Sequence, residues 1–187
     1  MIVVDTIEIF KTIKLLKMKK IIFTMITVSS FLANAQVAIG KSSVTNTSVS
    51  LEFGTGNRGI VLPWVTSAAS VTNSVDGTLI FDTTDKKVKY KKAGAWFDLT
   101  VDTTGIVDTN LQDAKTELTS AKAQIGGNPN TDTTSGILVL AATDKAMILP
   151  KTTYNSIINP AAGMMIYDTT AKQLAVFNGY VWSFWKP

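Results

Sequence analysis

The chain repeats one pattern twice, and this duplication constrains its fold more than any other feature. The two copies share a Leu-Pro motif, a motif ending in Asp-Thr-Thr and a later tryptophan, in the same order and with nearly equal spacing. The paired segments are 58–63 (RGIVLP) with 145–150 (KAMILP), 77–84 (GTLIFDTT) with 163–170 (GMMIYDTT), and Trp96 with Trp182. A duplicated unit of about fifty residues predicts a modular array. Proteins built from such arrays usually have structural or binding roles, whereas an enzyme normally has a single set of catalytic groups.

Alternating apolar and polar side chains in both copies predict half-buried strands, with the Asp-Thr-Thr segments as turns between them. We therefore predict a mainly β fold of two homologous small antiparallel β-meander repeats, 49–99 and 136–187, preceded by an arm at 36–48. In the second repeat, Asn178-Gly179 predicts a type I′ hairpin turn, because that turn needs positive φ at both central positions.

The linker between the repeats, 100–135, contains a heptad-patterned segment for which we predict a short helix at 111–125. Leu111, Leu118 and Ile125 recur at heptad spacing and form a candidate self-association stripe. Two heptads leave two alternatives open. The helix either joins copies of the chain as a coiled coil or packs on a neighbouring sheet.

The N-terminal region predicts export. Residues 18–35 combine two lysines, an apolar run and the small-residue sequence ANA, which is the pattern of a secretory signal peptide cleaved between Ala35 and Gln36. The apolar run is shorter than the roughly 20 residues that a membrane span needs, so a retained anchor is the weaker alternative. We expect residues 1–17 to be either a spurious upstream start or an extended N-terminus.

Composition narrows the classes of function. The chain has no histidine and no cysteine, which removes Ser-His-Asp and Cys-His relays, the usual zinc ligands and disulfides. We therefore expect no enzyme activity, no metal and no cofactor. Of the net charge of +4, three units lie in residues 1–35, so the remaining chain is close to neutral and nucleic acid is not an expected partner. An exported chain without disulfides fits a bacterial envelope, with the protein outside the cell, on its outer surface or in the periplasm.

Aromatic side chains near the predicted strand ends are the remaining candidates for a binding site. Aromatic rings stack on sugars or anchor protein interfaces. Strand alternation places Trp182 and Phe184 on one face of the last strand and Trp185 on the other. The candidate ligand or interface aromatics are Trp64, Trp96, Tyr180, Trp182 and Trp185.

The paired Leu-Pro and Asp-Thr-Thr motifs, followed in the second copy by the hairpin sequence FNGYVW at 177–182, resemble modules of secreted surface proteins of Bacteroidota, including tail-fibre-like ones. The resemblance implies a cell-surface location and a fibre or adhesin role, with no catalytic residues. We accordingly expect an exported, non-catalytic structural or adhesive protein, a fibre segment that forms a homo-oligomer, with a trimer among the candidate states. The alternative is a carbohydrate-binding module that uses exposed tryptophans to bind a surface glycan.

Overall fold

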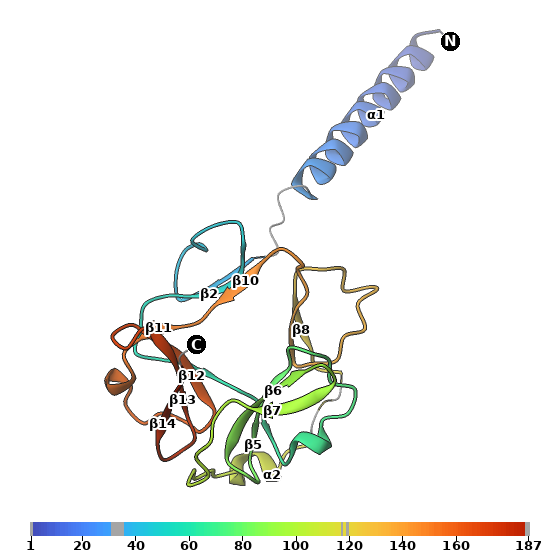
Figure 1. The fold of residues 1–187 in the computed structure, drawn as a ribbon. Coiled ribbons are helices and arrows are strands. Elements are labelled where there is room, and N and C mark those ends of the chain that lie inside the picture. The colour runs from blue at the N-terminus through green and yellow to red at the C-terminus, as the bar shows by residue number, and fades with distance from the viewer. Residues whose placement is uncertain (1, 31–35, 117, 119, 186–187) are drawn as a thin grey trace. The chain divides into compact units, whose positions relative to one another are not determined.

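The computed structural model of the chain separates into two compact units, Met1–Ala35 and Gln36–Pro187. The structure describes residues 2–30, 36–116, 118 and 120–185. The first unit is a single helix, α1 (Ile2–Ser30) (Figure 1). None of the helices in the described residues has the length and apolar character that crossing a membrane requires. The proposed cleavage sequence at 33–35 lies outside the described residues.

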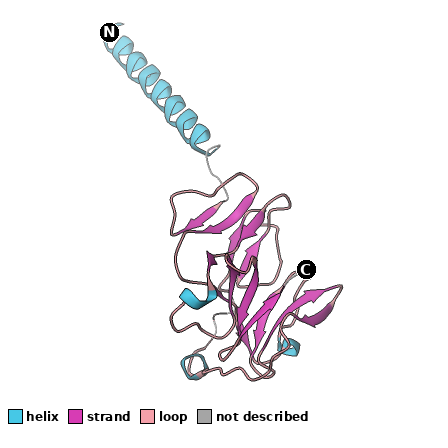
Figure 2. Ribbon diagram, turned by 60° about the vertical axis from the view of Figure 1, so that its left-hand side comes forward, coloured by secondary structure: helices cyan, strands magenta, loops and turns pink. Residues whose placement is uncertain are grey.

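The second unit is mainly β, as the sequence predicts (Figure 2). Its strands are β1 (Val37–Ile39), β2 (Val49–Phe53), β3 (Ile60–Val61), β4 (Trp64–Val65), β5 (Leu79–Asp82), β6 (Lys87–Lys92), β7 (Ala95–Asp98), β8 (Ala123–Ile125), β9 (Leu138–Leu140), β10 (Ala146–Ile148), β11 (Lys151–Thr152), β12 (Met164–Asp168), β13 (Gln173–Phe177) and β14 (Trp182–Trp185). The helical pieces are α2 (Asn110–Asp113) and two single 3₁₀ turns, η1 (Ala68–Ser70) and η2 (Tyr154–Ser156).

The order of these elements shows that the duplicated segment extends beyond the residues that share sequence motifs. Strands β1 to β7 with η1 are followed by β8 to β14 with η2, in the same order and with the same pairings within each set. Each set begins with a parallel pair, β1 with β2 or β8 with β9, and ends with an antiparallel meander edged by a parallel strand, β4 or β11. We call residues 36–99 repeat 1 and residues 122–185 repeat 2. The meanders match the sequence-based prediction, whereas the parallel pairs were not expected.

The predicted helix at 111–125 is wrong. Its described residues contain only the single turn of α2, and the segment ends in strand β8, where Ile125 pairs with Leu140 of β9. Leu118 lies outside any helix and is 70% exposed. Residues 117 and 119 lie outside the described residues.

Pairing with β9 explains why a strand replaces the end of that helix, because residues 123–125 make their backbone pairing with a parallel neighbour. Gly126 and Gly127 follow β8 with positive φ, +79° and +64°, as Gly40 follows β1 with φ +74°. Only glycine adopts this conformation at little cost, so the glycines turn the chain out of each short strand.

The Asn-Gly hairpin also differs from its prediction. In the register of β13 with β14 the central turn residues are Gly179 and Tyr180, and only Gly179 has positive φ, +100°. Asn178 instead accepts hydrogen bonds with its side chain from the turn amides. Glycine at the first central position is the requirement of a type II′ turn. The turn with positive φ at both central residues is in repeat 1, at Ala93 (+50°) and Gly94 (+77°).

The hydrophobic core lies between the two repeats. Each repeat contributes half of it: Leu62, Phe81 and Val88 from repeat 1, and Ala162, Met165 and Val176 from repeat 2. Strands also cross over, because β3 of repeat 1 pairs with β12, and β10 of repeat 2 pairs with β2 (Figure 1). Full burial of one such side chain contributes about 1.5–3 kcal/mol. Each repeat therefore depends on the other for its core.

Candidate self-association surface

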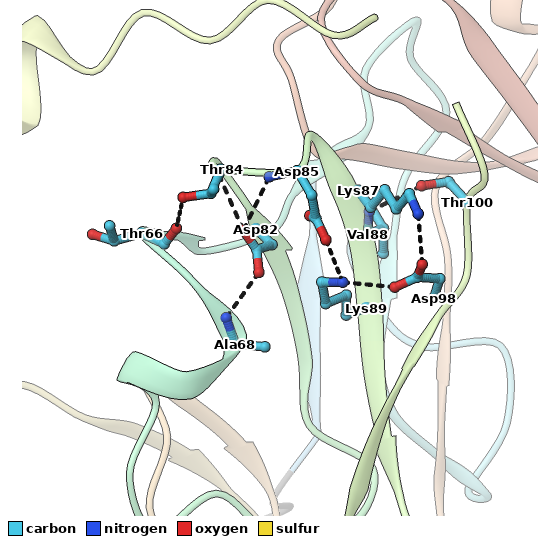
Figure 3. Close-up of polar contacts among 10 residues, drawn as sticks. All are labelled: Thr66, Ala68, Asp82, Thr84, Asp85, Lys87, Val88, Lys89, Asp98 and Thr100. Carbon is cyan, nitrogen blue, oxygen red and sulfur yellow. Dashed lines mark hydrogen bonds and ion pairs between the residues drawn. The ribbon is translucent and has the colours of Figure 1, made fainter. Parts of the chain in front are cut away.

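A buried aspartate fixes the turn between the first two meander strands in repeat 1 (Figure 3). The carboxylate of Asp82 accepts hydrogen bonds from the backbone N–H groups of Ala68 at 2.8 Å, Thr84 at 3.1 Å and Asp85 at 3.4 Å. It thereby ties the 3₁₀ turn η1 to the end of β5. This is the turn chemistry that the Asp-Thr-Thr motif predicts, because the side chain replaces missing backbone partners.

Asp168 makes the same three bonds in repeat 2. Its carboxylate accepts from the N–H groups of Tyr154 at 2.9 Å, Thr170 at 2.8 Å and Ala171 at 2.7 Å. Burial by itself raises the pKa of Asp168, but the three N–H donors outweigh it and hold that pKa below its ordinary value. Because the partners correspond one to one, residues of the two repeats can be compared position by position.

The lysine-rich face of β6 carries paired charges (Figure 3). Lys89 lies 2.6 Å from both Asp85 and Asp98, and Lys87 lies 2.7 Å from Asp98. Hydrogen bonds from the two lysines lower the pKa of Asp98. Burial lowers the pKa of Lys89, yet the two carboxylates outweigh it and raise that pKa. These four side chains carry no net charge together, so this part of the face does not form a concentrated basic patch.

Trp64, the first of the predicted aromatic residues, lies between the repeats. Its indole Nε1–H donates a hydrogen bond to the backbone carbonyl of Ala162 at 2.8 Å, and its ring packs on the shared core. A donor that joins residues of different repeats is a structural contact. Trp64 therefore stabilises the contact between the repeats.

Trp182 belongs to an aromatic cluster at the end of repeat 2. Its ring centroid lies 5.2 Å from that of Phe177 and 6.2 Å from that of Tyr154, and Phe184 lies 5.2 Å from Tyr154. Trp182 and Phe184 share a face, as alternation predicts. Tyr180, in the neighbouring turn, is 63% exposed.

Trp96 and Trp185 lie apart from that cluster. Trp96, on β7, is half-buried, with the Nζ of Lys91 5.7 Å from its ring centroid. Trp185 is 50% exposed and follows the register of the sheet in one row with Leu174 and Tyr167. The predicted aromatic residues thus occupy separate places.

Comparison of the repeats identifies a different candidate surface. We define the open face of repeat 2 as the apolar side chains whose counterparts in repeat 1 form the shared core or pack against it. Phe81 is 0% exposed, whereas its counterpart Tyr167 is 37% exposed. The open face consists of Leu149, Tyr167, Leu174 and Trp185, and its counterparts are Leu62, Phe81, Val88 and Leu99. Tyr167 and Trp185 are exposed, whereas Leu149 and Leu174 are half-buried and pack against the margin of the shared core. Sequence reasoning identified only Trp185 of this set; the alignment of the copies was the signal for the others.

The residues of the predicted helix do not form a stripe in the described structure. Leu118 is exposed and Ile125 is half-buried within a sheet, while the side chain of Leu111 lies outside what the structure describes. In the described parts of the chain, no group of acidic side chains is placed to hold a metal ion.

Comparison with known proteins gives one result. Residues 125–186 match the family model described as phage tail like trimerisation region, which covers repeat 2 from the last residue of β8 onward. No curated protein and no solved structure matches the chain. Repeat 2 is thus similar to a trimerisation region of phage tail-like proteins, and this similarity supports a fibre-like structural protein that associates with copies of itself.

Proposed function

We propose that the chain is an exported, non-catalytic, fibre-like surface protein whose mature part, Gln36–Pro187, works as a self-associating structural or adhesive segment. The observation that carries this proposal is the open face of repeat 2. A surface that repeat 1 uses to bury Phe81 completely is repeated in the same chain without a cover over Tyr167. Exposed apolar surface next to unpaired strand edges favours association with another sheet.

The N-terminal unit supports export. The division between the two compact units falls between Ala35 and Gln36, the bond at which the sequence predicts cleavage. The described core residues all lie beyond that bond, so removal of the first unit leaves the core intact. A leader that separates from an independently packed unit is what export followed by cleavage requires.

Light scattering after size-exclusion chromatography of Gln36–Pro187 tests the proposed self-association. We expect a trimer, in keeping with the similarity of repeat 2 to a trimerisation region. A monomer at micromolar concentration would contradict a self-associating fibre segment.

The alternative function is a carbohydrate-binding module. It is favoured by the exposure of Tyr180 and Trp185, since accessible rings can stack on sugar faces. A glycan array probed with Gln36–Pro187 and with the Tyr180→Ala variant separates the two functions. Glycan signals lost in Tyr180→Ala, from a protein that is monomeric, would favour the module over the fibre.

A further inference from the structure

The contact between the repeats joins two different surfaces, and the described residues form it only once. In this contact β3 of repeat 1 lies against β12 of repeat 2, and the N–H of Leu62 donates to the carbonyl of Gly163 at 3.1 Å. The counterparts of these two residues are Leu149 and Gly77. Within the described chain the N–H of Leu149 donates no hydrogen bond.

The second part of the contact is the pairing of β10 with β2. Strand β10 is the counterpart of β3 in repeat 2, and it pairs through the opposite edge. The N–H of Ala146 at the start of β10 donates to the carbonyl of Ser48 at 2.8 Å, which places β10 beside β2. Odd and even positions of a strand point their backbone groups to opposite edges. Because Leu62 and Ala146 occupy positions of opposite parity in the motif, β3 and β10 each have one edge paired and one edge free.

Strand β9 has a free edge that matches the free edge of β3. Strand β2 lies between β1 and β10, whereas β9 pairs only with β8 among the described residues. The consequence is visible in two equivalent leucines. Leu51 on β2 is 2% exposed and Leu138 on β9 is 48% exposed.

The apolar faces differ in the same way. A Cβ on Gly163 would lie 2.9 Å from the Cβ of Phe81, whereas a Cβ on its counterpart Gly77 would meet nothing within 4 Å. The space beside Gly77 corresponds to the space that Phe81 fills beside Gly163. Its equivalent occupant is Tyr167, on the open face of repeat 2.

One pair of residues has a different chemistry in the contact within the chain and in the corresponding contact between chains. Where Trp64 donates to Ala162 inside the chain, the counterparts are Lys151 and Asp76, both exposed. A lysine and an aspartate replace a tryptophan and an alanine at the two corresponding places. Their opposite charges favour each other across a contact that forms between chains.

We infer that repeat 2 of one chain docks on repeat 1 of a second copy. In this contact repeat 2 takes the part that repeat 1 plays within a chain, and repeat 1 takes the part of repeat 2. Three chains joined in this way close into a ring. This inference rests on the proposed self-association and specifies its surfaces. The free edge of β10 pairs with β5 of the next chain, and the free edge of β9 pairs with β3 of that chain. A contact between two different surfaces forms a closed ring or an open filament. The similarity of repeat 2 to a trimerisation region selects the ring of three.

Engineered disulfides test this geometry, because the chain contains no cysteine. Within the chain, Val61 on β3 is the aligned antiparallel partner of Met164 on β12. Since Leu62 bonds to Gly163, the 61–164 pair is of the non-hydrogen-bonded kind, with Cα atoms about 4.5 Å apart, which a disulfide can bridge. The counterpart pair between chains is Thr78 with Ile148.

The Thr78→Cys, Ile148→Cys double variant of Gln36–Pro187 is oxidised and run on a non-reducing denaturing gel. We expect a covalent trimer that returns to a monomer with reductant. The matched control, Val61→Cys with Met164→Cys, is expected to give an internally linked monomer. Each single variant is expected to give no covalent trimer.

The outcomes separate the inference from the proposed function. A protein that is trimeric by light scattering but gives no covalent trimer from the 78–148 pair would overturn the docking geometry and leave self-association standing. A ladder extending beyond three chains would overturn the closed ring. A monomer by light scattering in the unmodified protein would overturn both.

A non-covalent variant gives an independent measurement. Leu138→Asp places a charge on the free edge of β9, where the side chain is accessible within a single chain, so the chain is expected to fold and to dissociate into monomers. Val101→Asp is the matched control, because Val101 is 86% exposed and lies outside the inferred contact. A trimer that persists in Leu138→Asp with unchanged stability would contradict the contact.

Discussion

Gly163 lies against Phe81 so closely that a side chain on the glycine has no room. An added Cβ would come within 2.9 Å of the Phe81 Cβ and 3.1 Å of its Cγ, and the glycine has φ +74°. The glycine therefore serves both the turn before β12 and the seam between the repeats. Its counterpart Gly77 has φ +89° and open space around it.

This pair of glycines gives a matched measurement. Gly77→Ala is expected to cost about 1–2 kcal/mol, because an L residue is strained at positive φ. Gly163→Ala is expected to cost that amount and a further 1–3 kcal/mol, on the order of what overpacking a core costs. Chemical denaturation of both variants in the Leu138→Asp background, which is expected to be monomeric and so to leave the space beside Gly77 empty, measures the free energies of unfolding. Equal losses in the two variants would mean that the repeats are not packed together at Phe81.

Acid is expected to weaken the arm of repeat 1 through Glu52. Its carboxylate lies 2.7 Å from the Lys41 ammonium and accepts hydrogen bonds from the Thr45 N–H and hydroxyl, both at 2.6 Å. These contacts, the Lys41 bond first, lower the pKa of Glu52 from 4.5 to about 2. A depressed pKa gives stability that is present above the ordinary value and is lost as the pH falls toward about 2.

The measurement is the free energy of unfolding between pH 6 and pH 2, a window of about four units around the ordinary pKa of a glutamate. Glu52→Gln is expected to be less stable than the parent at pH 6 and to lose less stability on acidification. Asp144→Asn is the control, because the Asp144 carboxylate is exposed and lies 3.6 Å from Lys145. A pH profile that Glu52→Gln leaves unchanged would contradict the assigned contacts.

Trp64 is expected to act through its indole N–H. Trp64→Phe keeps an aromatic ring but leaves the buried carbonyl of Ala162 without its donor, which costs about 1–3 kcal/mol. Trp96→Phe is the control and is expected to cost less than about 1 kcal/mol, since a phenyl ring only weakens the contact with Lys91. Thermal unfolding of both variants decides between these values. A Trp64→Phe protein as stable as Trp96→Phe would count against the hydrogen bond between repeats.

Leu118→Asp is expected to change neither the oligomeric state nor the melting temperature. Leu118 is exposed in the described structure and has no place in the inferred contact, so a charge there stays in water. Leu138→Asp is its matched counterpart, with the opposite expectation. If Leu118→Asp dissociates the protein and Leu138→Asp does not, a coiled coil through the linker, and not the sheet edges, joins the copies.

The exported protein is expected to begin at Gln36. The Gln36 Nε2 donates hydrogen bonds to the carbonyls of Thr47 at 3.0 Å and Val49 at 2.8 Å, so the new N-terminus remains attached to its fold. Intact mass spectrometry of protein from the envelope fraction measures the terminus. Ala35→Asp is expected to retain the leader, because cleavage needs a small residue there. Detection of Met1 or Met18 at the N-terminus of the unmodified exported protein would be incompatible with this prediction.

The parts of the fold that depend on local chemistry could be predicted from the sequence. Asp82 and Asp168 occupy the predicted turns, because a short carboxylate side chain bonds to nearby amides whatever surrounds it. The meander strands could also be predicted, since four to six residues suffice to show the alternation of apolar and polar side chains. Their pairing then follows from the short turns between them.

The strands that join the repeats could not be predicted. Strand β3 has only two residues, too few to show a period, and its partner β12 lies about a hundred residues later in the chain. The heptad spacing from Leu111 to Ile125 misled because side-chain spacing does not reveal that residues 123–125 have a strand partner, β9, later in the chain.

Only part of the candidate surface could be predicted from the sequence, for a related reason. Phe81 and Tyr167 belong to the same motif and have similar side chains, yet one is buried and the other exposed. Residue type alone does not separate them. The difference arises from which repeat covers which, and that is a property of the assembled chain.

The location of the core also has a consequence for how the protein is made. Leu62 and Phe81 acquire the core partners that repeat 2 supplies only when Met165 and Val176 have been synthesised, so contacts of long sequence separation must form before the core is complete. Chains dominated by such contacts fold slowly. A growing chain that carries only repeat 1 lacks half of its core and remains loosely structured. Slow folding of this kind keeps the polypeptide unfolded until its last strands have left the ribosome, which agrees with the proposed export, because an unfolded chain can pass through a narrow channel.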